Sequence, residues 1–123
     1  MAELIISFGF RFGKPREPGA LVIDVRECGF GRNPYHDPAL RGLRGDDPRV
    51  ALDVEQTPGF DVTYAALKAR VAAYPGDVYL GCTGGHHRSV YLADRLGREL
   101  DVPVGHRDYF RDSPHGVAPT LWV

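Results

Sequence analysis

The chain has 123 residues, of which 43% are hydrophobic and 25% charged, and its formal net charge at pH 7 is −1. This length suits a single domain with one hydrophobic core, and the charge provides no overall basic field that would attract nucleic acid. The sequence shows no signal peptide, no apolar run near the ~20 residues of a membrane span and only two cysteines, so we expect a cytoplasmic protein without a disulfide framework.

The predicted elements alternate between strands and helices along the chain. Short apolar runs predict strands, and apolar residues spaced three and four apart predict helices. In chain order, the expected elements are strands at 4–10 and 20–25, a short helix from Asp47, a helix from Asp61, a strand at 78–82, a helix at 90–100 and a short strand at 102–104. This alternation predicts an α/β fold, a small three-layer domain with a mostly parallel sheet, over residues 1–123.

One long segment, residues 26–46, shows no period and is rich in Gly, Arg, Asp and Pro. Irregular segments of this length in a small domain are often functional. Asn33–Pro34 within it is typical of a turn. His36 and Arg41 are candidates to close over a ligand.

The glycine-rich run from Gly81 to Val90 lies between a predicted strand and a predicted helix. Such a loop offers free backbone N–H groups and the positive end of a helix dipole, and Arg88 adds a fixed guanidinium. These groups together predict an anion-binding loop for phosphate, sulfate or carboxylate. Its candidate ligand-binding residues are Cys82, Thr83, Gly84, Gly85, His86, His87, Arg88 and Ser89.

Charged residues also follow two other predicted strands. Asp24 and Arg26 come after the second strand, and His106 and Arg107 follow the last one. Ligands of parallel sheets bind beyond the carboxyl ends of the strands, so we expect these four residues to join the loop in one binding site. No metal site is predicted, because the adjacent histidines of the loop would point about 100° apart on a helix; an approach of His36 to His106 depends on folding. No cofactor is predicted.

Two resemblances bear on this site, and the first is local. Cys82 and Arg88 have the spacing C-x5-R, with Ser89 after the arginine, which resembles the signature loop of cysteine-dependent phosphatases. That resemblance implies a Cys82 thiolate that attacks phosphorus while Arg88 and the loop N–H groups hold the oxygens. A cysteine near a helix N-terminus and an arginine has a suitable environment for this role. The candidate general acids are Asp24, Asp37 and Asp108.

The loop departs from the phosphatase pattern in two ways. Gly81 stands where that family has a histidine, and the bulky His86 and His87 fill the second half of the loop. Cys82 also has a simpler interpretation, as a small buried residue at the end of a strand. We therefore favour binding without catalysis and keep a phosphatase that uses Cys82 as the alternative.

The second resemblance runs along most of the chain. Its motifs, in order, are Ser7–Phe10, Asp24–Arg26, Asn33–Pro34, Gly81–Gly85, His87–Val90 and His106–Asp108. Residues 4–108 resemble the C-terminal domain of the RapZ family of RNase adapter proteins. The resemblance implies a domain related to a sugar-phosphate kinase fold that binds glucosamine-6-phosphate in an anion pocket and, in some members, a small RNA and RNase E.

The chain departs from this family at three points. His86 stands where a lysine is common, the sequence contains no G-x-x-x-x-G-K-[ST] motif for nucleotide hydrolysis, and residues 109–123 form an apolar, divergent tail instead of a basic one. The tail weakens the expectation of an RNA partner. We predict a regulatory domain that binds a phosphorylated small metabolite such as an amino-sugar phosphate, without a membrane partner, and leave RNA and self-association open.

Overall fold

The sheet of this protein is fully parallel. The computed structural model describes residues 1–111. Its strands are β1 (Leu4–Gly9), β2 (Leu21–Asp24), β3 (Asp77–Cys82) and β4 (Val104–His106). They are arranged in the order β2-β3-β1-β4 and every neighbouring pair is parallel. The predicted α/β fold with a mostly parallel sheet is confirmed.

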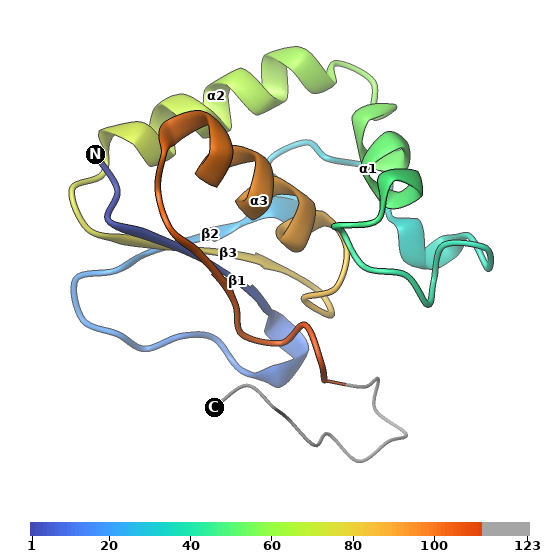
Figure 1. Cartoon of the computed structure of the whole chain (residues 1–123), viewed down its shortest axis with the longest axis horizontal. Helices are drawn as coiled ribbons and strands as arrows, with labels where there is room; N and C mark the ends of the chain where they lie inside the picture. The colour runs from blue at the N-terminus through green and yellow to red at the C-terminus, as the bar shows by residue number, and fades with distance from the viewer. Residues whose placement is uncertain (112–123) are drawn as a thin grey trace.

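Helices cover one face of this sheet. The helices are α1 (Pro48–Glu55), α2 (Phe60–Ala73) and α3 (Arg88–Leu100), and three single turns of 3-10 helix are η1 (Phe10–Phe12), η2 (Val25–Glu27) and η3 (Pro34–His36). In Figure 1, α2 and α3 lie over the same face, and α1 lies beyond the carboxyl ends of the strands. The segment from η1 to residue 20 runs along the opposite face, so the third layer of the domain is mostly irregular chain.

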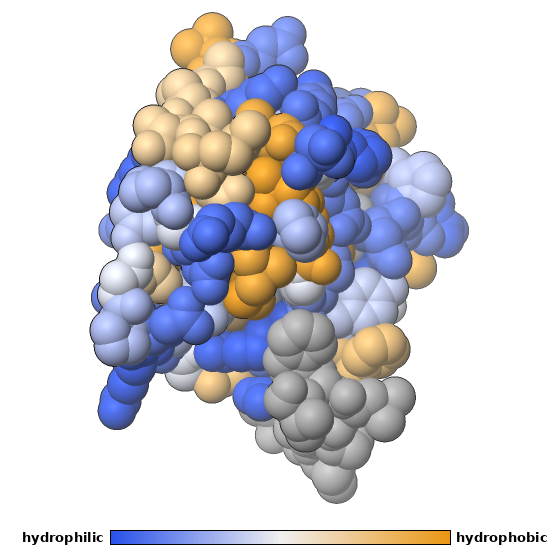
Figure 2. Space-filling model, turned by 60° about the vertical axis from the view of Figure 1, so that its left-hand side comes forward, coloured by the Kyte–Doolittle hydropathy of each residue, from blue (hydrophilic) through white to orange (hydrophobic). Residues whose placement is uncertain are grey.

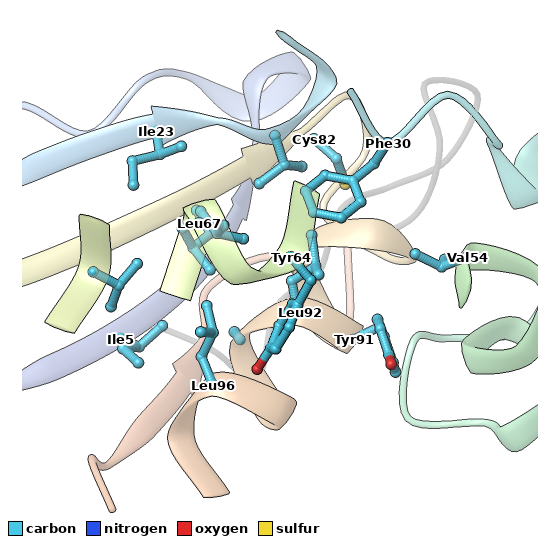
Figure 3. Close-up of a cluster of buried hydrophobic side chains, with 14 of the residues drawn as sticks. Ile5, Ile23, Phe30, Val54, Tyr64, Leu67, Cys82, Tyr91, Leu92 and Leu96 are labelled. Carbon is cyan, nitrogen blue, oxygen red and sulfur yellow. The ribbon is translucent and has the colours of Figure 1, made fainter. Parts of the chain in front are cut away.

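The main core lies between the sheet and these two helices. Ile5 and Ile23 point from the strands toward Leu67 of α2 and toward Leu92 and Leu96 of α3, and all five side chains are buried (Figure 3). Each such side chain contributes about 1.5–3 kcal/mol when it is fully removed from water. This core holds the start of α3 against the end of β3, where the glycine-rich loop connects them.

A smaller aromatic cluster covers the opposite face. The Phe8 ring lies 4.7 Å from the Phe10 ring and 6.3 Å from the Tyr79 ring, measured between centroids. The Tyr79 hydroxyl donates to Glu17 at 3.2 Å, and the Arg107 guanidinium lies 5.3 Å from the centroid of Phe8.

Figure 2, which views the side that carries the N-terminus, shows apolar surface gathered in one area among hydrophilic side chains.

Element boundaries differ from the predictions mainly in the last third of the chain. The third helix begins at Arg88, two residues before the predicted start, and the last strand covers 104–106 instead of 102–104. The last strand begins later because residues 101 and 102 still belong to the C-terminal cap of α3. Asp101 adopts a left-handed conformation, and the Val102 N–H donates to the Gly97 carbonyl.

The part of the chain that the structure describes has no helix long and apolar enough to cross a bilayer. The prediction of a divergent tail concerns residues 109–123, of which 112–123 lie outside the described residues.

Candidate anion-binding site

Close backbone contacts hold the glycine-rich loop, residues 83–87, in place. Gly85 has φ +74°, a left-handed conformation that favours glycine, and its Cα lies so close to β1 that an added Cβ would be 2.6 Å from the Gly9 nitrogen. The Gly45 N–H donates to the His86 carbonyl at 2.7 Å, and the Arg11 N–H donates to the Thr83 carbonyl at 3.0 Å. The loop is therefore held both by the end of β1 and by the long irregular segment.

The loop presents backbone donors that have no protein partner. Among residues 1–111, no acceptor is found for the backbone N–H groups of residues 84–90. His87 stands at the N-cap of α3 without a capping hydrogen bond from its side chain. The aligned peptides of this 13-residue helix place partial positive charge at the same point. An anion at the loop would satisfy these donors.

Arg88 is a buried cation with unused hydrogen-bonding capacity. Arg88 is the first residue of α3, and it is only 7% exposed. Nη1 donates to the Phe30 carbonyl at 3.0 Å, while Nε has no acceptor within the described chain. Burial lowers the pKa of Arg88 from its ordinary value. A buried guanidinium without a counter-charge is costly, and an anionic ligand would remove that cost.

The loop forms one wall of a pocket of about 430 Å³. The lining residues are Cys82, Thr83, Gly84, His86, His87 and Arg88 from the loop and Arg11, Asn33, Tyr35, Arg41, Gly42 and Arg44 from two other segments. The lining includes four arginines and no carboxylate, and none of the four forms an ion pair within residues 1–111. Elsewhere Arg32, for example, pairs with Asp53 at 2.6 Å. The pocket therefore carries uncompensated positive charge, which favours anionic ligands.

Two of these arginines are oriented by neutral groups. Arg41 Nε donates to the Tyr35 carbonyl at 2.8 Å, and its guanidinium lies 4.7 Å from the centroid of the Tyr35 ring. Arg44 Nε donates to the Tyr109 carbonyl at 2.7 Å. Carbonyls and aromatic faces hold a guanidinium in place but leave its full charge uncompensated.

Both histidines of the loop are held neutral at pH 7. Burial, and secondarily the positive charge of Arg44, lowers the pKa of His86 to about 4. Burial also lowers the pKa of His87, whose Nε2 donates to the Arg41 carbonyl at 3.2 Å. The His86 Nε2 atom is buried and has no partner among residues 1–111. The histidines can therefore act as hydrogen-bonding groups in the pocket without adding charge.

Cys82 and Ser89 form a buried pair, of which Cys82 lines the pocket and Ser89 does not. Cys82 is 3% exposed and Ser89 is fully buried, and Cys82 Sγ lies 3.0 Å from Ser89 Oγ. Cys82 also belongs to the hydrophobic core, beside Phe30 (Figure 3). Cys82 and Cys28 are both free thiols. Cys82 and Arg88, the two residues of the C-x5-R motif, thus line the same pocket, and the Cys82 thiol is largely enclosed by the protein.

Asp24 and Arg26 lie outside the pocket, next to Thr83. Asp24 accepts a hydrogen bond from the Arg26 N–H and pairs with its guanidinium at 2.8 Å, and these hydrogen bonds lower the pKa of Asp24. Arg26 Nη1 lies 3.4 Å from the Thr83 hydroxyl. The two residues do not line the pocket, but Arg26 touches one of the residues that do.

The structure does not bring His106 and Arg107 into the pocket. His106 Nδ1 lies 2.6 Å from Ser7 Oγ and its Nε2 lies 2.8 Å from Asp94, while Arg107 pairs with Asp108 at 2.8 Å. The reason is the strand order, because β1 separates β4 from β3. This segment supports the site indirectly, since buried Asp108 accepts the Gly9 N–H at 2.7 Å.

Sequence reasoning missed several lining residues. Arg11, Asn33, Tyr35 and Arg44 were not predicted, whereas Arg41 was. The length and composition of residues 26–46 indicated a functional segment, but an aperiodic segment carries no signal for the direction of each side chain.

Of the described residues, no group of three or more His, Cys, Asp or Glu is placed to hold a metal ion.

Comparison with known proteins places the chain in a family. Residues 1–110 match the family model described as the RapZ C-terminal domain. The chain belongs to the RapZ C-terminal domain family. Its relatives include nucleotide-binding proteins of Rhodospirillum rubrum, 45% identical over 88% of this chain and 37% of the relative, and of Thermus thermophilus, 41% identical over 88% and 43%. A nucleotide-binding protein of Heliobacterium modesticaldum is 39% identical over 91% of this chain and 41% of its own length. The chain thus spans less than half the length of these relatives.

Proposed function

We propose that this RapZ C-terminal domain is a regulatory binding domain for a phosphorylated small metabolite. The observation that carries the proposal is Arg88, a buried cation with an unused donor at the floor of a pocket without carboxylates. The backbone N–H groups of residues 84–90 have no acceptor within residues 1–111, and four of these residues line the same pocket. The two free thiols are in keeping with a cytoplasmic protein.

Each part of the pocket has a role in this proposal. The loop N–H groups and the Arg88 guanidinium hold the phosphate oxygens, because charge-assisted hydrogen bonds to phosphate are strong and directional. Neutral His86 and His87 contact hydroxyl groups of the metabolite. The pocket volume of about 430 Å³ lies within the range of sites that enclose a small ligand.

The finer proposal is an amino-sugar phosphate such as glucosamine-6-phosphate, on the strength of the family resemblance. An ammonium group requires a carboxylate or carbonyl partner, and the lining contains no carboxylate. Asp24 does not line the pocket but pairs with Arg26, which touches Thr83 of the lining, and it is the carboxylate we assign to this role. Glucose-6-phosphate separates the two levels of the proposal, because it keeps the phosphate and lacks the amine.

Calorimetric titration with glucosamine-6-phosphate tests both levels. Arg88→Ala is expected to weaken binding by about tenfold or more, since a hydrogen bond to a charged group contributes ~1.5–3 kcal/mol. Arg98→Ala is the matched control, because Arg98 is an exposed arginine of α3 outside the pocket. Unchanged affinity in Arg88→Ala contradicts the phosphate site, and equal affinity for the two sugar phosphates contradicts amine recognition. Far-UV circular dichroism establishes that each variant is folded.

A cysteine-dependent phosphatase is the second candidate, and the shared pocket of Cys82 and Arg88 favours it. The enclosure of Cys82 and its contact with Ser89 favour binding alone. Hydrolysis of a chromogenic aryl phosphate between pH 5 and 8, abolished in Cys82→Ser, would establish catalysis. Absence of turnover by the wild-type chain, with phosphate binding retained in Cys82→Ser, would exclude it.

A further inference from the structure

We propose that the pocket has a second phosphate subsite nearer its opening, and that it can hold, besides a sugar monophosphate, a small metabolite with a diphosphate or a similarly spaced pair of phosphates. The proposal rests on the proposed function for the inner phosphate. It adds an outer phosphate subsite formed by Arg41 and Arg44. A sugar monophosphate would occupy the inner subsite only.

The inner subsite is complete without the outer arginines. A terminal phosphate presents three oxygens, and the floor offers the N–H groups of residues 84–90 together with Arg88, whose Nε is unpartnered within residues 1–111. These donors can hold a terminal phosphate without any contact from Arg41 or Arg44. Arg41 and Arg44 are therefore available to a different anionic group.

The charge of the pocket leads to the same conclusion. A phosphate monoester carries about −1.5 to −2 at pH 7, whereas four arginines line the pocket with no carboxylate among the lining residues. One monoester would leave about two positive charges close together without compensation. With a second phosphate, the negative charge of the ligand comes close in magnitude to the positive charge of the four arginines.

The arginines also differ in depth. Arg88 is buried together with Cys82 and His87, which sets the floor, whereas Arg41 is exposed with its guanidinium beside the exposed Tyr35 ring. Arg44 is half-buried and is oriented by the Tyr109 carbonyl. The positive charges thus extend from the floor toward the opening of the pocket, so that an elongated anion can contact both Arg88 and the outer arginines.

The enclosed floor favours a small molecule over a nucleic acid strand. Arg88 and His87 are 7% and 6% exposed, so the inner phosphate must be a terminal group that enters the pocket. Consecutive phosphates inside an RNA strand need a groove that tracks the backbone. The net charge of −1 also gives little long-range attraction for a polyanion.

Calorimetry at one pH and ionic strength, with inorganic phosphate and inorganic diphosphate as probes, tests the second subsite. The wild-type domain is expected to bind diphosphate about tenfold more tightly than phosphate, or better, which is a difference of ~1.4 kcal/mol. Arg41→Gln and Arg44→Gln are each expected to weaken diphosphate binding by a larger factor than phosphate binding, which removes most of this advantage. The matched control is Arg16→Gln, an exposed arginine that does not line the pocket.

The outcomes separate this inference from the proposed function. Equal affinity for the two anions, or an advantage that survives in both variants, overturns the outer subsite and leaves the phosphate site in place. Failure of both anions to bind overturns both proposals. Displacement of bound diphosphate by a single-stranded oligoribonucleotide at equal phosphate concentration assigns the site to a polymer and overturns the small-molecule ligand. The Arg41 side chain is exposed and contacts only the nearby Tyr35, so Arg41→Gln provides a folded test even if Arg44→Gln unfolds.

Discussion

Replacing Gly85 by alanine is expected to destabilise the domain by about 2–4 kcal/mol. A left-handed conformation, φ +74° at this position, costs an alanine about 1–2 kcal/mol. The added Cβ would also lie 2.6 Å from the Gly9 nitrogen and 2.9 Å from the Phe8 carbonyl carbon. Both are main-chain atoms of β1, so the sheet edge or the loop must move, and such overpacking costs about 1–3 kcal/mol. The smaller entropy of the unfolded variant offsets less than about 1 kcal/mol.

Gly84 provides the matched control in the same loop. An added Cβ at Gly84 meets no atom within 4 Å, and its φ is not in the left-handed range. The free energy of unfolding of Gly84→Ala is therefore expected to lie within about 0.5 kcal/mol of that of the wild-type chain. Urea denaturation followed by far-UV circular dichroism measures both variants, and calorimetry measures their affinity for phosphate. If Gly85→Ala had the same denaturation midpoint and phosphate affinity as Gly84→Ala, the loop would not depend on its glycine backbone and our account of the site would be refuted.

Two further predictions concern pH. Burial and Arg44 lower the pKa of His86 from 6.5 to about 4, so the unfolded chain binds a proton that the folded chain does not, and stability should fall as the pH drops from 6.5 to about 4. His86→Gln should remove that part of the slope of melting temperature against pH; identical slopes would contradict a neutral His86. Hydrogen bonds from Tyr64 and then from Lys68 and Arg95 lower the pKa of Glu99 from 4.5 to about 2, so its contribution is complete above pH 4.5 and is lost as the pH falls toward 2. Glu99→Gln should therefore be less stable than wild type at pH 7, with a difference that shrinks below pH 4.5; a constant difference would show that the carboxylate charge is not involved.

The elements that the sequence predicted correctly are those set by local chemistry. The Asp47 side chain accepts the Arg49 N–H and begins α1, as an acidic N-cap followed by proline indicates. Three residues of the apolar stripe of α2, Tyr64, Leu67 and Val71, are buried as their spacing predicts. The glycine-rich connection between β3 and α3 is likewise where the sequence places it.

The composition of the pocket was decided by tertiary structure. Arg26 and Arg88 both follow strands, yet Arg26 pairs with Asp24 while Arg88 stays without a carboxylate partner in residues 1–111. Nothing in the local sequence distinguishes these two outcomes, because each depends on which chain segment packs alongside.

The sequence by itself thus determined the α/β alternation, the loop with its glycines and a helix start beside that loop, because periodicity, capping and backbone freedom act over a few residues. Only the tertiary structure decided that Arg41 and Arg44 face this loop and that His106 does not. The path of an aperiodic segment and the order β2-β3-β1-β4 depend on contacts between residues far apart in the chain, and those contacts select which charges share one pocket.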